Sequence, residues 1–356
     1  MSETPVLLYG ANGFTGRLIA ERARARGVEL VLAGRTREAI EPLAKRLGYE
    51  FRVFGLDGEA AFDGIRGAKV VLHCAGPYSK TSAPMVEACL KARAHYLDIT
   101  GEYQVLEAVL ARGDDAVARG VVLLPAVGFD VVPTDCMAQK LKGELPSAVR
   151  LELAFTGDNM MPSAGTAKTT VENLHVGAKV RRGGVIVSIP APLKREIPFA
   201  DGPRFAMSIP WGDIVTAFHS TGIPDITVYT VVPKGVARAA SVLRFCAPVL
   251  KLPSVIRLLQ KEVEKRAKGP DEVQRRTTRM SVWGRVEDDQ GRAVEGHLSL
   301  PEGYELTVLA ALASVERVLR GDVAPGATTP SRAFGADFVT TLPGVGSFNI
   351  VSPALS

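Results

Sequence analysis

The sequence predicts an α/β protein of two domains, with a doubly wound parallel sheet first and then an α+β domain built on a mostly antiparallel sheet. Short apolar runs alternate with helical patterns up to about residue 125. A glycine-rich turn separates the first run from the first helical pattern, and from residue 149 apolar and polar residues alternate. Continuous apolar runs are typical of strands buried on both faces, whereas alternation indicates a strand with one wet face.

Composition narrows the class of protein. The 356 residues suffice for two domains, and 46% hydrophobic with 23% charged residues is an ordinary globular balance. The four cysteines are scattered without a C-x-x-C pair, and the histidines lack metal-ligand spacing. We therefore expect a reducing compartment, no disulfide framework and no metal site. The first strand begins near Pro5 and no apolar run is long enough to span a bilayer, which predicts a cytoplasmic protein.

The first apolar run, 6–9, ends at the turn that organises the rest of the chain. Gly10, Gly13 and Gly16 form G-x-x-G-x-x-G, a spacing typical of dinucleotide-binding turns. The three glycines allow the tight turn, the approach of a pyrophosphate and close packing of helix on strand. The phosphates would lie over free N–H groups at the positive end of the helix. We predict a Rossmann cofactor site whose turn residues are Gly10, Asn12, Gly13, Phe14, Thr15 and Gly16.

The next strand, 30–33, ends in Gly34-Arg35-Thr36-Arg37. An NAD enzyme places an acidic residue at this position to bind the ribose hydroxyls, and here Arg35 and Thr36 stand instead. An acid would repel a 2′-phosphate, whereas an arginine can bind it with paired N–H groups. The sequence therefore predicts NADP(H) as the cofactor, with Arg35 and Thr36 at the phosphate.

Strand 69–73 leads into a loop that we expect beside the nicotinamide. In a doubly wound sheet, loops at the carboxyl ends of strands line the ligand crevice. Ala75, Gly76 and Pro77 are therefore predicted cofactor contacts, although a plain Gly-Pro turn is an alternative. Tyr78 is a candidate proton donor. Asp98 and Glu102, after the next strand, are either a functional carboxylate pair or, for Glu102, a charge favoured in a first helical turn.

These motifs resemble the saccharopine dehydrogenase-like oxidoreductases, a family that includes the trans-acting enoyl reductases. The resemblance implies an NADP- or NAD-binding Rossmann domain and a substrate domain built on a β-sheet, with the C-terminal segment returning to the first domain. We expect a Rossmann domain over 1–133 joined by 304–356, and a substrate domain over 134–303. The resemblance is carried by residues 10–16, 33–35, 76–78, 95–102, 128–135, 165–166, 303–307 and 330–335.

The substrate domain opens with the alternating strand 149–155, followed by a helical pattern over 163–176. Gly165, Thr166 and Lys168 stand at the start of that helix, where an anionic or carbonyl group could be held. Close packing of the helix through Gly165 is the alternative. Lys168 is the second candidate for a proton donor or carbonyl anchor. Residues 277–300 read as a hairpin with its turn at 288–291.

The segment 234–268 is strongly basic. It holds nine Lys or Arg and two Glu, a net charge of +7, which leaves −2 for the rest of a chain of net +5. Apolar residues between these charges make it typical of a segment that binds an anionic membrane surface or a partner. A core-facing helix with a solvated basic face is the alternative. Nucleic acid is not expected, since the segment has one aromatic residue and no recognised nucleic-acid motif.

We therefore expect an NADP(H)-dependent oxidoreductase. Residues 159–165 are mostly apolar or small, which together with the basic segment favours an apolar acyl or isoprenoid substrate with a reducible double bond. A saccharopine-type amino-acid dehydrogenase, which would need convergent arginines, and a non-catalytic NADP-binding peripheral membrane module are alternatives. A homo-oligomer is compatible with the sequence.

Overall fold

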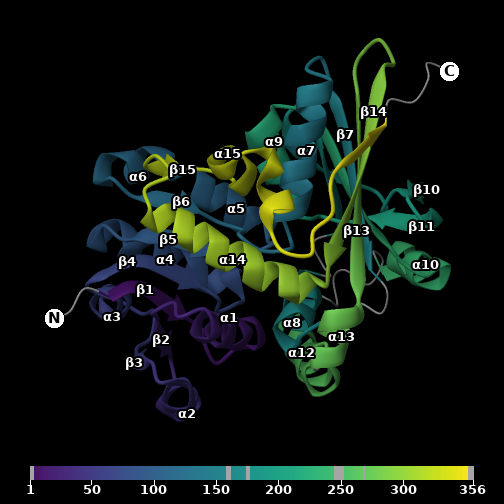
Figure 1. The fold of residues 1–356 in the computed structure, drawn as a ribbon. Helices are drawn as coiled ribbons and strands as arrows, with labels where there is room; N and C mark the ends of the chain where they lie inside the picture. Colours follow the sequence, from purple (N-terminus) through teal and green to yellow (C-terminus); the bar gives the residue numbers. More distant parts are fainter. Residues whose placement is uncertain (1–3, 158–161, 174–176, 244–251, 268, 352–356) are drawn as a thin grey trace. The chain divides into compact units, whose positions relative to one another are not determined.

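The computed structural model describes residues 4–157, 162–173, 177–243, 252–267 and 269–351 (Figure 1). The chain forms two compact units, Met1–Val132 with Tyr304–Gly335, and Pro133–Gly303 with Ala336–Ser356. One unit holds a parallel sheet and the other a mostly antiparallel sheet. The predicted fold class is confirmed.

The sheet of the first unit has the strand order β15-β6-β5-β4-β1-β2-β3, and each neighbouring pair is parallel. The order reverses at β1, which places a crevice at the carboxyl ends of β1 and its neighbours. The strands are β1 (Thr4–Tyr9), β2 (Val31–Gly34), β3 (Glu50–Val53), β4 (Ala68–His73), β5 (His95–Asp98), β6 (Val122–Leu124) and β15 (Gly326–Ala327).

Helices cover both faces of this sheet because successive strand side chains point to opposite faces. Val6 and Leu8 pack in one apolar cluster with α1, α2 and α14, whereas Leu7 and Tyr9 pack in the other with α3, α4, α5 and α6. The helices are α1 (Phe14–Ala25), α2 (Arg37–Leu47), α3 (Ala60–Ile65), α4 (Tyr78–Ala92), α5 (Tyr103–Leu110), α6 (Gly113–Arg119), α14 (Gly303–Leu319) and α15 (Pro330–Phe334).

The sheet of the second unit has the order β10-β11-β12-β7-β13-β14-β16, with β8 pairing to β12 and β9. Of its pairs, β12 with β7 is parallel and the others are antiparallel. The strands are β7 (Arg150–Gly157), β8 (Ala178–Arg182), β9 (Val185–Ile189), β10 (Lys194–Phe199), β11 (Gly202–Ser208), β12 (Asp225–Val231), β13 (Arg279–Glu287), β14 (Ala293–Pro301) and β16 (Asn349–Val351).

The apolar face of this sheet is packed by α7 (Val132–Glu144). A Cβ at Gly284 or Gly296 would meet Met137 within 2.7 Å, so the helix lies directly on β13 and β14. The other helices of the unit are α8 (Ala164–Asn173), α9 (Asp213–Thr221), α10 (Lys234–Leu243), α12 (Pro253–Arg266) and α13 (Glu272–Thr277), and α12 packs on α8. Residues 244–251 and 268 of the basic segment lie outside the described residues, as do 158–161, which include 159–161 of the apolar stretch.

The assignment of all of 304–356 to the first domain is wrong for the part that begins at Ala336. Residues from Ala336 onward belong to the second unit. The physical reason is strand pairing: β16 extends the second sheet with Asn349, Ile350 and Val351 opposite β14. The 3-10 helix η2 (Ala336–Thr341), with its buried Phe338, precedes it. The C-terminal return therefore serves both units in turn.

Candidate functional site

The turn after β1 has the form required to hold phosphates. Gly10 has φ +81°, and a Cβ there would lie 2.8 Å from the backbone nitrogen of Ala75. A Cβ at Gly16 would lie 2.9 Å from Ala11 Cα and closer still to the Gly10 carbonyl. Gly13 is the N-cap of α1 and brings no side-chain cap, and the first turn of α1 holds no acidic residue. The first N–H groups of α1 are thus open to an anion, as the motif predicts.

The residues between the glycines differ in their surroundings. Asn12 is exposed, and its Oδ1 lies 3.1 Å from where a Cβ of Gly34 would be, so its side chain reaches the end of β2. Thr15 is half-buried. The Phe14 ring packs edge-on against Tyr304 of α14, with ring centroids 4.9 Å apart. The backbone of Phe14 remains a predicted cofactor contact, whereas its side chain anchors α14.

Arg35 stands at the end of β2 with an exposed side chain. Among the described residues, no carboxylate forms an ion pair with Arg35, whereas Arg37 pairs with Glu41 at 3.3 Å and lies over the Phe51 ring. Burial raises the pKa of the Tyr9 hydroxyl, and the charge of Arg35 lowers it, so the guanidinium lies near the end of β1. The role of Arg35 at a 2′-phosphate stays a prediction, and its exposed side chain is compatible with that role. Thr36, the N-cap of α2, is exposed and makes no side-chain cap bond.

The loop after β4 lies against the glycine turn. The Cys74 N–H donates to the Tyr9 carbonyl at 2.8 Å, and Ala75 touches Gly10 as described above. Gly76 is exposed and is joined to Pro77 by a cis peptide bond. The Thr81 hydroxyl donates to the Ala75 carbonyl at 2.6 Å. The structure thus brings the 75–77 loop beside the phosphate turn, where a nicotinamide end would lie.

Tyr78 follows this loop, and its side chain is buried. Its side chain is 9% exposed, and its hydroxyl donates to the His73 carbonyl at 3.2 Å. Burial is the largest of the effects that raise its pKa. A phenol that is already bonded to the backbone and shielded from solvent is poorly placed to protonate a substrate. The geometry favours a packing role for Tyr78 over the predicted role of proton donor.

Two buried carboxylates link the loops at this edge of the sheet. Asp98 accepts from the Thr100 N–H at 3.0 Å, from the Ala126 N–H at 2.8 Å and from the Tyr96 hydroxyl at 2.6 Å. Glu102 accepts from the N–H groups of Tyr78 and Ser79, both at 3.0 Å. Glu102 does more than either predicted role, a functional carboxylate pair or a charge in a first helical turn, describes. It stands at the start of α5 and also caps a second helix, α4.

Several buried groups at this edge have shifted pKa values. Burial raises the pKa of Asp98 to about 6, while three hydrogen bonds oppose the shift. Burial and the nearby charge of Glu102 raise the pKa of Asp130, in the loop after β6, to about 7. Burial lowers the pKa of His73 to about 3. Asp130 was not singled out by sequence reasoning, although its position just after a parallel strand was a usable signal.

Lys168 lies on α8 of the second unit with a half-buried side chain. The helix begins at a serine cap, since Ser163 Oγ accepts from the Thr166 N–H at 3.3 Å. The first unit by itself brings together the glycine turn, Arg35 and the 75–77 loop, and Lys168 is not part of it. No described group of His, Cys, Asp or Glu is placed to hold a metal ion.

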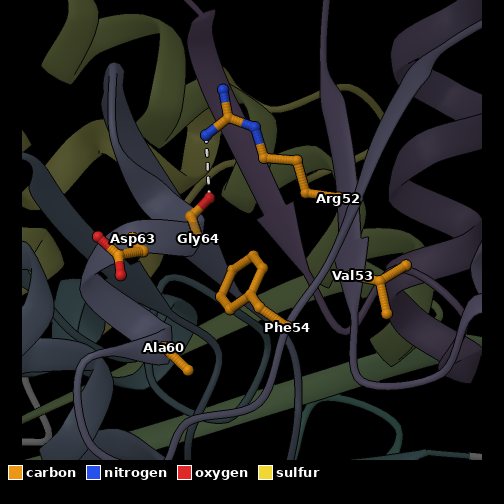
Figure 2. A pocket seen from close by; sticks show the side chains of 6 residues that line it. All are labelled: Arg52, Val53, Phe54, Ala60, Asp63 and Gly64. Carbon is orange, nitrogen blue, oxygen red and sulfur yellow. Dashed lines mark hydrogen bonds between the residues drawn. The ribbon is translucent and has the colours of Figure 1, made fainter.

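A hollow of about 520 Å³ lies at the end of β3, beside α3 (Figure 2). Phe54 forms one side, and its ring also packs on Tyr9 with centroids 5.0 Å apart. Arg52 Nη1 donates to the Gly64 carbonyl at 2.9 Å, so its guanidinium already holds α3. The hollow therefore offers mainly aromatic and aliphatic surface. Its lining residues are Arg52, Val53, Phe54, Ala60, Asp63 and Gly64.

Comparison with known proteins bears on both units. Residues 6–124 match the family model described as saccharopine dehydrogenase NADP binding domain. The trans-acting enoyl reductase of Mycobacterium leprae (strain TN) is 32% identical over 148 residues, covering 39% of this chain and 35% of that protein. The saccharopine dehydrogenase-like oxidoreductase of Homo sapiens is 30% identical over 151 residues, covering 36% and 35%. The chain thus spans about a third of the length of these relatives.

The fold extends the similarity along the whole chain. The apo histidine-tagged saccharopine dehydrogenase (L-Glu forming) from Saccharomyces cerevisiae superposes with a TM-score of 0.66 and 12% identity, over 98% of this chain and 100% of that one. The predicted resemblance to the saccharopine dehydrogenase-like oxidoreductases is confirmed, and so is the prediction that the cofactor is NADP.

Proposed function

We propose that this chain, whose first unit is an NADP-binding domain of the saccharopine dehydrogenase type, is an NADPH-dependent reductase of a double bond in an apolar acyl or isoprenoid substrate. The observation that carries the cofactor part is that no described carboxylate forms an ion pair with Arg35, which lies near a phosphate turn whose helix start has no side-chain cap. NADPH would supply a hydride to one carbon of the double bond, and the neighbouring carbon takes a proton.

The substrate part is supported by two arginines on the sheet of the second unit, each of which already has a carboxylate partner. On its sheet, Arg285 lies 2.6 Å from Glu287 and 3.4 Å from Glu295. Arg195 pairs with Glu152. An arginine that already has a carboxylate partner must give it up to bind a dicarboxylic amino acid, which costs free energy. The pairing favours a substrate without several carboxylates, and the name of the enoyl reductase relative agrees with this class.

The chain would supply binding, orientation and a proton. The N–H groups at the start of α1 bind the pyrophosphate, and the 75–77 loop bounds the nicotinamide end. Asp130 is largely buried at the same edge, and with a pKa of about 7 it can exchange a proton near neutrality. Lys168 remains a proposed anchor for the substrate carbonyl, since an ammonium can stabilise charge that develops on that oxygen.

Turnover of NADPH tests this proposal. We expect loss of NADPH absorbance with medium-chain enoyl thioesters or unsaturated isoprenoid aldehydes, and no gain of NADPH absorbance when saccharopine is offered with NADP⁺. A Lys168→Met variant should raise KM or lower kcat for the enoyl substrate by about tenfold, because one charged hydrogen bond is lost. Oxidation of saccharopine would overturn the substrate class. NADPH binding without turnover of either class would favour the non-catalytic module.

We also propose that the basic segment meets an anionic membrane surface, where an apolar substrate collects. In α12, Leu258 is 69% exposed, and Arg257, Lys261 and Lys265 are exposed as well. We call this the α12 surface, consisting of Arg257, Leu258, Lys261 and Lys265. An exposed leucine among cations suits an interface of apolar tails and anionic head groups. Among the described residues, no helix is long and apolar enough to cross a bilayer, so the association would be peripheral.

Sedimentation with anionic liposomes tests this surface. The unmodified protein should sediment with phosphatidylserine vesicles at low salt and come off as salt screens the charges. Each well-placed cation contributes roughly 1 kcal/mol to membrane binding. Arg257→Glu/Lys261→Glu should therefore reduce binding by more than tenfold, because two attractive charges are lost and two repulsive charges are added. The matched control is Arg26→Glu/Arg66→Glu, which makes the same charge change at exposed arginines of the first unit. Equal losses in both variants would contradict a specific surface.

A further inference from the structure

The loop that bounds the nicotinamide end has an unusual external support. The segment from Ala75 to Ser79 runs from the glycine turn into α4, whose N-cap, Pro77, provides no side-chain cap. The first N–H groups of α4 need acceptors, because helix starts leave them unpaired. Glu102 provides these acceptors from the next loop: Oε1 accepts from the Tyr78 N–H and Oε2 from the Ser79 N–H, both at 3.0 Å.

Glu102 is itself held by the loop that follows β5. Its backbone N–H donates to Thr100 Oγ1 at 3.1 Å, and the Thr100 N–H donates to Asp98 Oδ1 at 3.0 Å. The same Asp98 oxygen accepts from the Ala126 N–H in the loop after β6. The loops after β4, β5 and β6 are therefore connected by one chain of hydrogen bonds. Glu102 joins this chain to the 75–79 segment through both of its carboxylate oxygens.

We propose that Glu102 is a positioning residue: its carboxylate fixes the 75–79 segment, and through it the wall against which the nicotinamide is ordered. The proposal rests on the proposed function, because it assumes NADPH at the glycine turn. It goes further than that function because it gives Glu102, which need not touch NADPH, the role of ordering the nicotinamide end of the cofactor. The adenosine end would be held independently by Arg35 and the turn.

The geometry explains why a carboxylate is needed. The N–H groups of the successive residues Tyr78 and Ser79 both face the Glu102 side chain, so both of its terminal atoms must accept a hydrogen bond. The positive end of α4 also favours a negative charge. Glutamine has one accepting atom, and its amide NH₂ would oppose the second N–H, so Glu102→Gln would release one residue of the pair with little change in side-chain size. Small displacements near reacting atoms have large effects on rate.

The test compares Glu102→Gln with the unmodified full chain. We expect the dissociation constants of NADPH and of an adenosine bisphosphate that carries the 2′-phosphate to stay within about threefold. The enhancement of nicotinamide fluorescence on binding should fall by about half or more, and kcat for the enoyl substrate should fall by about tenfold or more with little change in KM. Thr100→Val, which removes the acceptor for the Glu102 N–H, should show a weaker form of the same split if Glu102→Gln does not fold.

The matched control is a helix cap far along the chain. Asp271 accepts from the Gln274 N–H at 2.8 Å and caps α13 in the second unit. Asp271→Ala removes this cap and should lower the melting temperature without changing nicotinamide fluorescence or kcat. If Glu102→Gln behaves in the same way, Glu102 is a helix cap only and the proposal is overturned. The proposal is also overturned if Glu102→Gln loses affinity for NADPH and for the adenosine bisphosphate to the same extent. Failure of the unmodified protein to bind NADPH would instead refute the proposed function, and the inference with it.

Discussion

Gly16→Ala is expected to abolish NADPH binding and to lower the free energy of unfolding by about 2–3 kcal/mol, the usual cost of forcing atoms into a packed site. The added methyl would meet the Gly10 carbonyl and Ala11 Cα, which are backbone atoms of the phosphate turn and cannot rotate away. Either α1 moves off β1 or the turn opens. Both changes would misplace the N–H groups that bind the pyrophosphate.

Urea unfolding and titration with NADPH measure the two effects. The control is Gly143→Ala on α7, where an added Cβ meets nothing within 4 Å. Alanine is the better helix former by about 0.8–1.0 kcal/mol, so this variant should gain stability and keep its affinity. Unchanged NADPH affinity in Gly16→Ala would show that the turn does not hold the cofactor in the predicted way.

Arg35→Ala should remove most of the preference for NADPH over NADH. A hydrogen bond to a charged group is worth about 1.5–3 kcal/mol, which corresponds to about 10- to 150-fold in relative affinity. NADH lacks the 2′-phosphate, so its binding should change little. The dissociation constants of both cofactors, measured by fluorescence titration, give the ratio directly.

Arg37→Ala is the matched control for this variant. Arg37 is two residues away and is engaged by Glu41 and the Phe51 ring. Since exposed ion pairs contribute little, its loss should leave both stability and cofactor preference nearly unchanged. If Arg37→Ala removes the preference and Arg35→Ala does not, the assignment of the two arginines is reversed. Equal affinity of the unmodified protein for both cofactors would end the interpretation.

The first unit was predictable because its signals are local. The strand at 6–9 is apolar throughout since both of its faces are buried, and the glycine spacing lies within one turn. One boundary depends on a single residue type: the helical region after β5 is divided into α5 and α6. Gly113 begins the second helix, and glycine weakens helix continuity.

The candidate site was less predictable wherever it depends on contacts between distant segments. The position of Tyr78 soon after β4 predicts that it lies near the crevice. The hydrogen bond of its hydroxyl to the His73 carbonyl depends on tertiary packing and could not be predicted. The double cap by Glu102 joins loops 23 and 24 residues apart, which no local pattern contains. The divided C-terminal return has the same origin, because strand pairing of β16 is decided by the edge of the second sheet.

The position of α14 has a consequence for the order in which the protein folds. Val308, Ala311 and Leu312 on this helix complete the apolar cluster of the first sheet beside Val6 and Leu8. On the ribosome, α1 and α2 can cover part of that face, but the part under α14 stays uncovered until the polypeptide of the second unit has been synthesised. Contacts so distant in sequence slow folding, and uncovered apolar strands are prone to aggregate. We expect a nascent chain that ends near residue 132 to need chaperone protection, and a deletion of the last 50 or so residues to leave both units incomplete.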